Sequence, residues 1–211
     1  MMKKRLISVV VGVLLFFLLA IPAFAVTSVS VWYSNEDNVG YNPYDGSYYI
    51  YNLSSSSSFS TNFQAAVTRA NSQWSSVLPI SISETSFNYA INYIYGGTYN
   101  QLKSSFPALK QSNTGLTVVY RKTEDKTIVY YNSSSKKVYP IQAGGKMCVV
   151  EKNGRTADGY KNTAIHEMGH LFGWWGHSSN SSDVMYSYAT EIISLTTRDK
   201  THLKQIYTRF Y

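Results

Sequence analysis

Apolar and polar positions follow two spacings along this chain, and each spacing predicts one kind of element. Alternation predicts a strand, because successive side chains of an extended backbone point to opposite faces. Apolar residues that recur every three or four positions predict a helix with one buried face. Alternating or short apolar segments predict strands at residues 26–33, 80–82, 89–95, 117–120, 127–131 and 146–151.

The best amphipathic helix of the chain is predicted from Phe63 to Val77. A Ser, Thr or Asn at residues 60–62 can cap its start, and Pro79 prevents it from continuing. Its buried face is expected to consist of Phe63, Ala66, Val67, Ala70, Trp74 and Val77.

Two more helices are predicted further along the chain. The first starts near Asp158 or Asn162 and ends near Phe172, and the second covers residues 198–207. Residues 35–60 are rich in Asn, Gly, Tyr and Ser, which predicts a loop or a loose hairpin. This order of elements favours a mixed α/β or α+β domain.

Residues 1–25 have the three-part pattern of a secretory signal peptide. Three basic residues at 3–5 precede an apolar run at 6–21, and Ala23 and Ala25 form a small-x-small cleavage site. We therefore expect a leader at 1–25 and one exported domain at 26–211. The alternative is an uncleaved membrane anchor, since a span needs roughly 17–25 residues.

Charge and cysteine content narrow the possible partners. The chain has 19 basic and 12 acidic residues, and without the leader 16 basic residues remain, giving a net charge of +4. This mild excess, without a dense basic stripe, argues against nucleic-acid binding and is compatible with attachment to an anionic cell surface. With the single cysteine Cys148, no disulfide can form within the chain, so stability must come from the core.

Three of the four histidines lie within residues 166–177. On a helix, residues four apart share a face, so His166 and His170 can bind one ion. Glu167 is displaced around the helix and can reach a metal-bound water. This H-E-x-x-H pattern predicts zinc-assisted hydrolysis with Glu167 as the catalytic base.

A catalytic zinc usually takes three protein ligands and keeps one position open. Gly173 can end the helix in a left-handed conformation, after which the chain turns back. His177 lies just past this turn and is the predicted third ligand, with Asp183 as the alternative.

These residues resemble the metzincins. Residues 166–177 are similar to the extended zinc motif H-E-x-x-H-x-x-G-x-x-H, and residues 182–186 are similar to the Met-turn. Ser178 after the third histidine, and Tyr186 after Met185, are typical of the matrixin type. The resemblance implies an α+β fold, in which a twisted mixed sheet packs against two helices and a zinc cleft lies under the edge strand.

The chain departs from the family pattern at one point. The family spacing places the third histidine at Gly176, so this chain has one extra residue after Gly173. We expect the two glycines to let the backbone take a wider turn that still delivers His177. The proline that follows the Met-turn in the family is also missing.

The resemblance implies a secreted metalloendopeptidase that acts on peptide or protein substrates. Glu167 would activate a zinc-bound water, and Met185 would form an apolar floor under the ligands. Tyr186 and Tyr188 belong to the segment that walls a specificity pocket in the family, and an extended peptide would add to the edge strand. We expect a monomer that has no membrane insertion after leader cleavage.

Two other functions stay open at this point. One is an exported zinc-binding domain without activity, and the other is a zinc hydrolase of non-peptide amide bonds in cell walls. Cys148 is expected to be a buried core thiol and His202 a surface residue. Trp174 and Trp175 either line the cleft or pack over the helix end. Calcium is not supported by a ligand spacing, and its nearest candidates are Glu36, Asp37 and Asp45.

Overall fold

The computed structural model describes residues 38–41, 46–119, 129–131, 136–140, 144–174 and 176–207. The predicted leader at 1–25, the predicted strand at 26–33, Trp175 and the three acidic residues considered for calcium lie outside these residues, and their roles stay predictions. Among the helices within the described ranges, none is long and apolar enough to cross a membrane.

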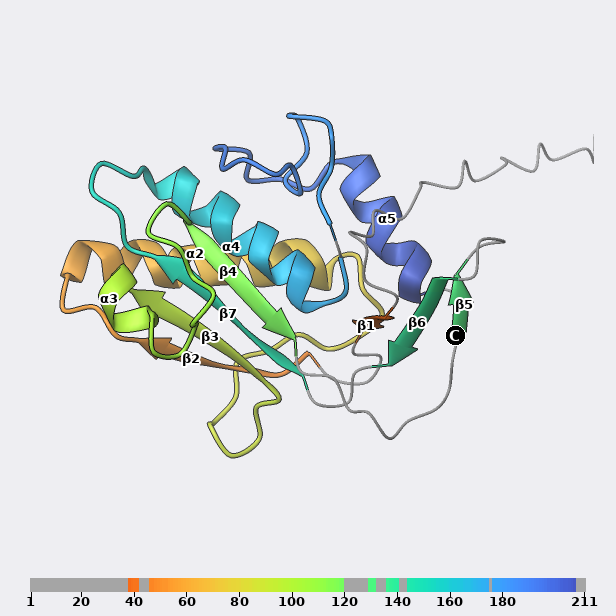
Figure 1. Ribbon diagram of the computed structural model, residues 1–211, viewed down its shortest axis with the longest axis horizontal. Helices are drawn as coiled ribbons and strands as arrows, with labels where there is room; N and C mark the ends of the chain where they lie inside the picture. Colours follow the sequence, from red (N-terminus) through yellow and green to blue (C-terminus); the bar gives the residue numbers. More distant parts are fainter. Residues whose placement is uncertain are drawn as a thin grey trace, which may run out of the picture. The chain divides into compact units, whose positions relative to one another are not determined.

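A four-stranded mixed sheet forms the centre of the fold, in the order β2-β3-β7-β4 (Figure 1). Its first three strands are parallel, whereas the edge strand β4 is antiparallel to β7. The sheet and its separate helices confirm the predicted α+β class. The strands are β2 (Tyr48–Asn52), β3 (Asn92–Gly97), β7 (Gly145–Val150) and β4 (Gly115–Val119).

The segment predicted as a strand at 80–82 is not a regular strand. Its backbone instead bonds to the chain at and just before the start of β2, where the Gly46 amide donates to the Ser81 carbonyl and the Tyr48 amide donates to the Ser83 carbonyl, both at 2.9 Å. An isolated parallel bridge joins Tyr48 to Glu84. Ile80 and Ile82 are both buried, so the alternation correctly identified the inward-facing residues although the pairing is irregular.

A second sheet has three strands in the order β1-β6-β5. They are β1 (Asn38–Tyr41), β6 (Lys136–Pro140) and β5 (Val129–Tyr131). The predicted loop at 35–60 was therefore wrong in part, since β1 and β2 both lie in it. Tyrosine and isoleucine favour strands, and the run from Tyr48 to Tyr51 does so despite its Ser- and Asn-rich surroundings.

Helix α2 (Ser57–Ser75) begins earlier than predicted, because Ser56 caps it by accepting a hydrogen bond from the Phe59 amide at 3.2 Å. The serine run at residues 54–58, predicted as a loop, contains this cap and the first residues of the helix. The short helix α3 (Tyr99–Leu102) was not predicted, although Thr98 and Gln101 form a capping box there.

The two later helices were predicted correctly to within a residue or two. Helix α4 (Ala157–Leu171) is capped by Thr156, whose hydroxyl accepts from the Gly159 amide at 3.0 Å. Helix α5 (Thr197–Tyr207) closes the described part of the chain.

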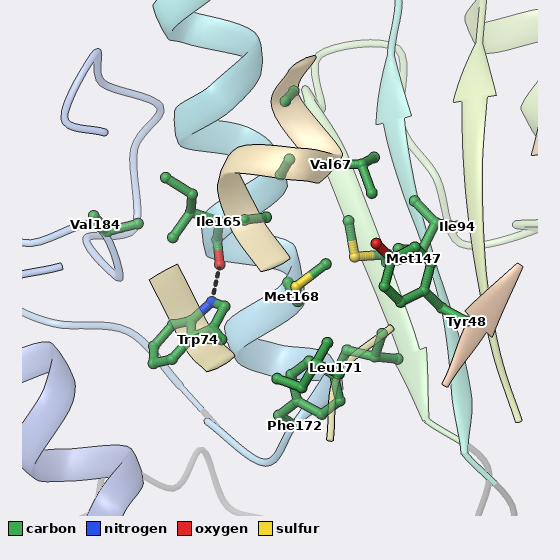
Figure 2. Packing of buried hydrophobic residues seen from close by; sticks show 14 of the residues in the cluster. Tyr48, Val67, Trp74, Ile94, Met147, Ile165, Met168, Leu171, Phe172 and Val184 are labelled. Atoms are coloured by element: carbon green, nitrogen blue, oxygen red, sulfur yellow. Dashed lines mark hydrogen bonds between the residues drawn. The ribbon is translucent and has the colours of Figure 1, made fainter. Parts of the chain in front are cut away.

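Side chains on the two faces of the sheet belong to two different cores. Met147 and Val149 face the core that α2 and α4 form with the sheet, and Ile165, Met168 and other large residues fill it (Figure 2). Cys148 and Val150 face the opposite way, toward Leu102, Phe106 and Leu109. The prediction of a buried Cys148 thiol is confirmed, and burial raises its pKa.

Trp74 joins α2 to α4. Its indole is fully buried, and its Nε1–H donates to the Ile165 carbonyl at 2.8 Å (Figure 2). Ile165 directly precedes His166, so this contact fixes the position of α4 along α2 next to the first histidine.

We expect Trp74→Phe to lower the free energy of unfolding by about 1–3 kcal/mol, because it leaves a cavity and removes the hydrogen bond. Urea unfolding followed by circular dichroism measures this change. Gln64→Ala on the exposed face of the same helix is the control, and it should change stability by less than about 0.5 kcal/mol. Equal effects of the two substitutions would contradict the role of Trp74.

Candidate metal centre

Helix α4 carries His166, Glu167 and His170. The helical spacing brings the first and third of these residues together, and their Nε2 atoms lie 3.0 Å apart. Nδ1 of His166 lies 2.9 Å from the Val184 carbonyl oxygen, and Nδ1 of His170 lies 2.6 Å from that of Trp174. Backbone from two other segments therefore orients both rings.

These contacts determine which nitrogen carries the proton. A carbonyl oxygen can only accept, so Nδ1 is the donor in each ring and each Nε2 presents a lone pair. Burial lowers the pKa of His166 to about 4 and that of His170 well below its usual value, so both rings are neutral. Two lone pairs at this distance repel each other unless a cation lies between them, and a divalent metal fits this requirement.

The end of α4 turns the chain back toward the same point. The Trp174 amide donates to Gly169 at 2.8 Å and the Gly173 amide donates to His170 at 3.1 Å, which is the Schellman pattern. Gly173 has φ +108°, a value that side-chain-bearing residues rarely adopt. This turn also brings the Trp174 carbonyl oxygen within hydrogen-bonding distance of Nδ1 of His170.

A second left-handed residue follows, because Gly176 has φ +78°. His177 comes directly after it. One ring nitrogen from each of His166, His170 and His177 lies within 4.8 Å of the other two. The two glycines thus accommodate the extra residue, and the three imidazoles converge.

Met185 lies under the helix that carries the first two histidines. It is fully buried. A Cβ atom built on Gly169 would lie 2.6 Å from the Met185 sulfur and 2.8 Å from Cζ2 of Trp74. The side chains of Met185 and Trp74 therefore both contact the helix backbone between the two zinc-motif histidines.

Two backbone contacts join the third histidine to the methionine segment. The Ser178 amide donates to the Met185 carbonyl at 2.7 Å, and Ser178 forms an isolated bridge with Tyr186. The same two residues that resemble the matrixin type thus connect His177 to the segment whose Val184 carbonyl orients His166.

A buried aspartate, Asp199, binds the backbone of the segment that contains Val184 and Met185. Asp199 accepts from the Val184 amide at 3.1 Å and from the Thr196 amide at 3.0 Å. Burial raises the pKa of Asp199, although the bonds from the Thr196 and Val184 amides oppose this rise. Asp199 therefore stabilises the segment around Met185 through hydrogen bonds from backbone amides rather than through an ion pair.

Asp183, the alternative third ligand, faces away from the histidines. Its oxygens accept from Ser178 at 2.5 Å, from Thr196 at 2.7 Å and from Arg198 Nε at 2.6 Å. Burial alone would raise its pKa, but these hydrogen bonds and the charge of Arg198 lower it overall. Asp183 is thus a structural carboxylate, and the alternative is wrong.

Glu167 lies between α4 and the edge strand β4. Its side chain is mostly buried, with 7% exposed, and Oε2 accepts from the Thr117 hydroxyl at 2.7 Å. Burial raises the pKa of Glu167 to about 7, and the hydrogen bond from Thr117 partly counters this rise. A carboxyl group of that pKa can both accept and donate a proton near neutral pH.

A cleft of about 170 Å³ opens beside these groups. His166, Glu167 and His177 line one side of it. Residues 113–115, which lead into β4, residues 162–163 of α4 and residues 186–189 after Met185 also line it. Tyr188 is exposed, at 72%, and its ring centroid lies 5.6 Å from that of Tyr186.

The comparison with known families agrees with this geometry. The family model described as Matrixin matches residues 40–208. The chain belongs to the matrixin family. No curated protein matches it. Matrixins are metallopeptidases that bind a catalytic zinc, and the three converging histidines of this matrixin are compatible with that metal.

Several residues that build the matrixin site were not identified from the sequence. Thr117 contacts Glu167 from a distant part of the chain, and no local pattern indicates this contact. Asp199 could have been identified from the sequence, because the spacing of Thr196 and Asp199 is that of a capping box. In the structure the Asp199 amide donates to the Thr196 hydroxyl at 3.1 Å, and the Thr196 amide donates to the Asp199 carboxylate at 3.0 Å. Asn162 bridges α4 to Thr190 and Ile192 with bonds of 3.1 and 2.8 Å.

His202 was wrongly predicted as a surface residue. It is fully buried, and its ring centroid lies 3.9 Å from that of Trp174. Burial lowers its pKa to about 4. Trp174 is fully buried as well, so it packs over the end of α4 against α5 rather than lining the cleft.

We expect Gly169→Ala to destabilise this matrixin, although alanine gains about 1 kcal/mol of helix propensity. The new methyl group would overlap Met185 and Trp74, and overpacking costs about 1–3 kcal/mol. Gly159→Ala in the same helix is the matched control, because its nearest contacts are side-chain atoms of Arg155 and Thr156 at 3.2 Å. Thermal unfolding should show a larger drop in Tm for Gly169→Ala than for Gly159→Ala.

We expect Asp183→Asn to cost about 1–3 kcal/mol at pH 7, since hydrogen bonds to a charged group are lost. The folded pKa of Asp183 lies below its ordinary value of 3.8. The ionised form therefore contributes its full stability above that ordinary value and loses it as pH falls through the folded pKa. Urea unfolding of metal-free protein from pH 7 to pH 3 should show the two proteins converging only at acid pH. A constant difference would contradict this account.

Proposed function

We propose that this matrixin is an exported zinc endopeptidase, with His166, His170 and His177 as the metal ligands and Glu167 as the catalytic base. The observation that supports this most directly is the convergence of three imidazole nitrogens, two of them with Nδ1 committed to a carbonyl. A zinc site that is purely structural does not need a buried carboxylate beside its ligands, and this cleft has one.

The division of work follows from the residues present. Bound zinc supplies Lewis-acid chemistry at this point of the cleft. The three neutral imidazoles would hold it, and the carbonyls of Val184 and Trp174 keep two of the rings in the required tautomer. Glu167 accepts a proton as the attacking water adds to the peptide carbonyl and delivers it to the leaving amine.

The cleft also suggests where a peptide lies. β4 is an edge strand of its sheet and begins at the cleft, so an extended peptide can pair with its backbone. Tyr186 and Tyr188 form the opposite wall and would contact a side chain of the substrate. Met185 acts as the floor under the ligands.

The remaining parts of the proposal concern the chain as a whole. We propose that residues 1–25 direct export and are removed, and that residues 26–211 form the catalytic domain. The enzyme acts as a monomer on peptide or protein substrates. Signal-peptide cleavage is tested by mass spectrometry of the protein recovered from culture medium, which should begin at Val26.

We expect His177→Ala to weaken zinc binding by at least about 100-fold, because a ligand contributes more than the outer partners that cost 10–100-fold. Competition with a chromophoric chelator measures the affinity. Ser179→Ala, an exposed neighbour, is the control and should bind zinc normally. Stoichiometric zinc of unchanged affinity in the His177 variant would remove this histidine from the ligand set.

We expect Glu167→Gln to bind zinc normally but to lower kcat by about 10²–10⁴-fold, since the proton acceptor is lost. Defined peptides and cell-wall fragments should be assayed in parallel, with and without a chelator. Cleavage of peptides that the chelator abolishes supports the proposal. A wild-type protein that binds zinc but cleaves neither substrate, or cleaves only cell-wall fragments, would refute the endopeptidase.

A further inference from the structure

Strand β4 contacts the catalytic carboxylate with two residues on one of its faces. Side chains two apart on a strand point to the same side. Gly115 and Thr117 therefore face α4, whereas Leu116 and Val118 pack on the opposite core. The two residues that face α4 are also the two that lie against Glu167.

Gly115 restricts the space around the Glu167 side chain. A Cβ atom built on this glycine would lie 2.7 Å from Cγ of Glu167 and 2.8 Å from Oε1. It would also lie 2.8 Å from the carbonyl oxygen of Cys148, which the sheet keeps in place. The strand backbone thus packs directly against the carboxylate arm, at a position where no larger residue fits.

Thr117 supplies a directed contact to the same group. Its Oγ1 lies 2.7 Å from Oε2 and 2.9 Å from the backbone carbonyl oxygen of Glu167. The hydroxyl has one proton to donate, and an ionised carboxylate is the stronger acceptor. The hydrogen bond from Thr117 reaches Oε2 and not Oε1. The two carboxylate oxygens therefore differ, since Oε2 accepts a hydrogen bond from Thr117 and Oε1 packs against the backbone at Gly115.

We propose that Thr117 is a positioning residue, which holds Oε2 of Glu167 so that Oε1 is the oxygen left to exchange protons in the cleft. This inference rests on the proposed function. The contact fixes the rotation of the carboxylate about its last bond, a freedom that the packing against Gly115 does not remove. Loss of the hydroxyl leaves the base in the cleft but lets it rotate.

The test compares Thr117→Ser with Thr117→Ala. Both variants lose the same methyl group and differ only in the hydroxyl. We expect Thr117→Ala to lower kcat by about 10–100-fold, the size typical of partners that orient a site residue, with little change in KM. Thr117→Ser should restore kcat to within a few fold of wild type. Thr68→Ala, on the exposed face of α2, is the control for a threonine outside the cleft.

A purely structural tie between β4 and α4 would give a different result. In the Glu167→Gln background a positioning residue has little left to position, so Thr117→Ala should leave the residual kcat unchanged. The zinc affinities of Thr117→Ala and Thr117→Ser should agree with each other, whereas Thr117→Ala should have the lower Tm because it loses the bond to the buried carboxylate. Thr117→Val, which keeps the shape of threonine, should behave like Thr117→Ala.

Each failure has its own signature. If the wild type cleaves peptides, Glu167→Gln shows the expected loss of kcat, and Thr117→Ala retains full kcat, the positioning role is wrong while the proposed function stands. The role is also wrong if Thr117→Ala lowers the residual rate of Glu167→Gln by the same factor as in wild type. If the wild type itself cleaves no peptide, the proposed function fails and this inference fails with it.

Discussion

The convergence of three imidazole nitrogens at one point is the constraint on which the rest of the site depends. His166 and His170 approach to 3.0 Å through nitrogens that cannot donate to each other, and His177 adds a third nitrogen nearby. Contacts among the rings themselves do not favour this arrangement. The orientation must be imposed from outside the rings, and here backbone carbonyls and helix packing impose it.

The contacts that orient the histidine rings come from several parts of the chain, and these parts also hold one another in place. Trp74 fixes α4 against α2, the Schellman turn directs the Trp174 carbonyl to one ring, and the Met185 segment directs the Val184 carbonyl to the other. Asp199 then holds the Met185 segment through its amides. Much of the buried polar network thus acts on the site through main-chain groups, which explains why few of its members were recognisable from the sequence.

Local patterns made the three longer helices, most strands of the four-stranded sheet and the clustering of the histidines predictable. The i, i+4 spacing of His166 and His170 and the glycine after them are local signals, and the structure brings the two rings together and turns the chain at Gly173. The start of α2 was missed because the cap Ser56 is indistinguishable in composition from the serines around it. β2 was missed for the same reason, since its strand-forming tyrosines lie in a polar segment.

Contacts between distant residues were not predictable. Thr117 reaches Glu167 only because β4 pairs antiparallel to β7 and thereby lies along α4. His202 becomes buried only because α5 returns to cover the end of α4, where Trp174 meets it. Asp183 carried the right atoms for a metal ligand, and only the folded positions of Ser178, Thr196 and Arg198 show that those atoms are already engaged. Such facts depend on topology, which no short pattern contains.

The pair of left-handed glycines at 173 and 176 has a consequence for the evolution of such sites. Because one glycine ends the helix and the other resets the direction of the chain before His177, the linker can grow by a residue without moving its endpoint. The requirement on the sequence is therefore a pair of permissive backbone positions rather than a fixed count between histidines. Proteins whose linkers lengthened in this manner would escape any search that insists on rigid spacing, while keeping the three histidines together.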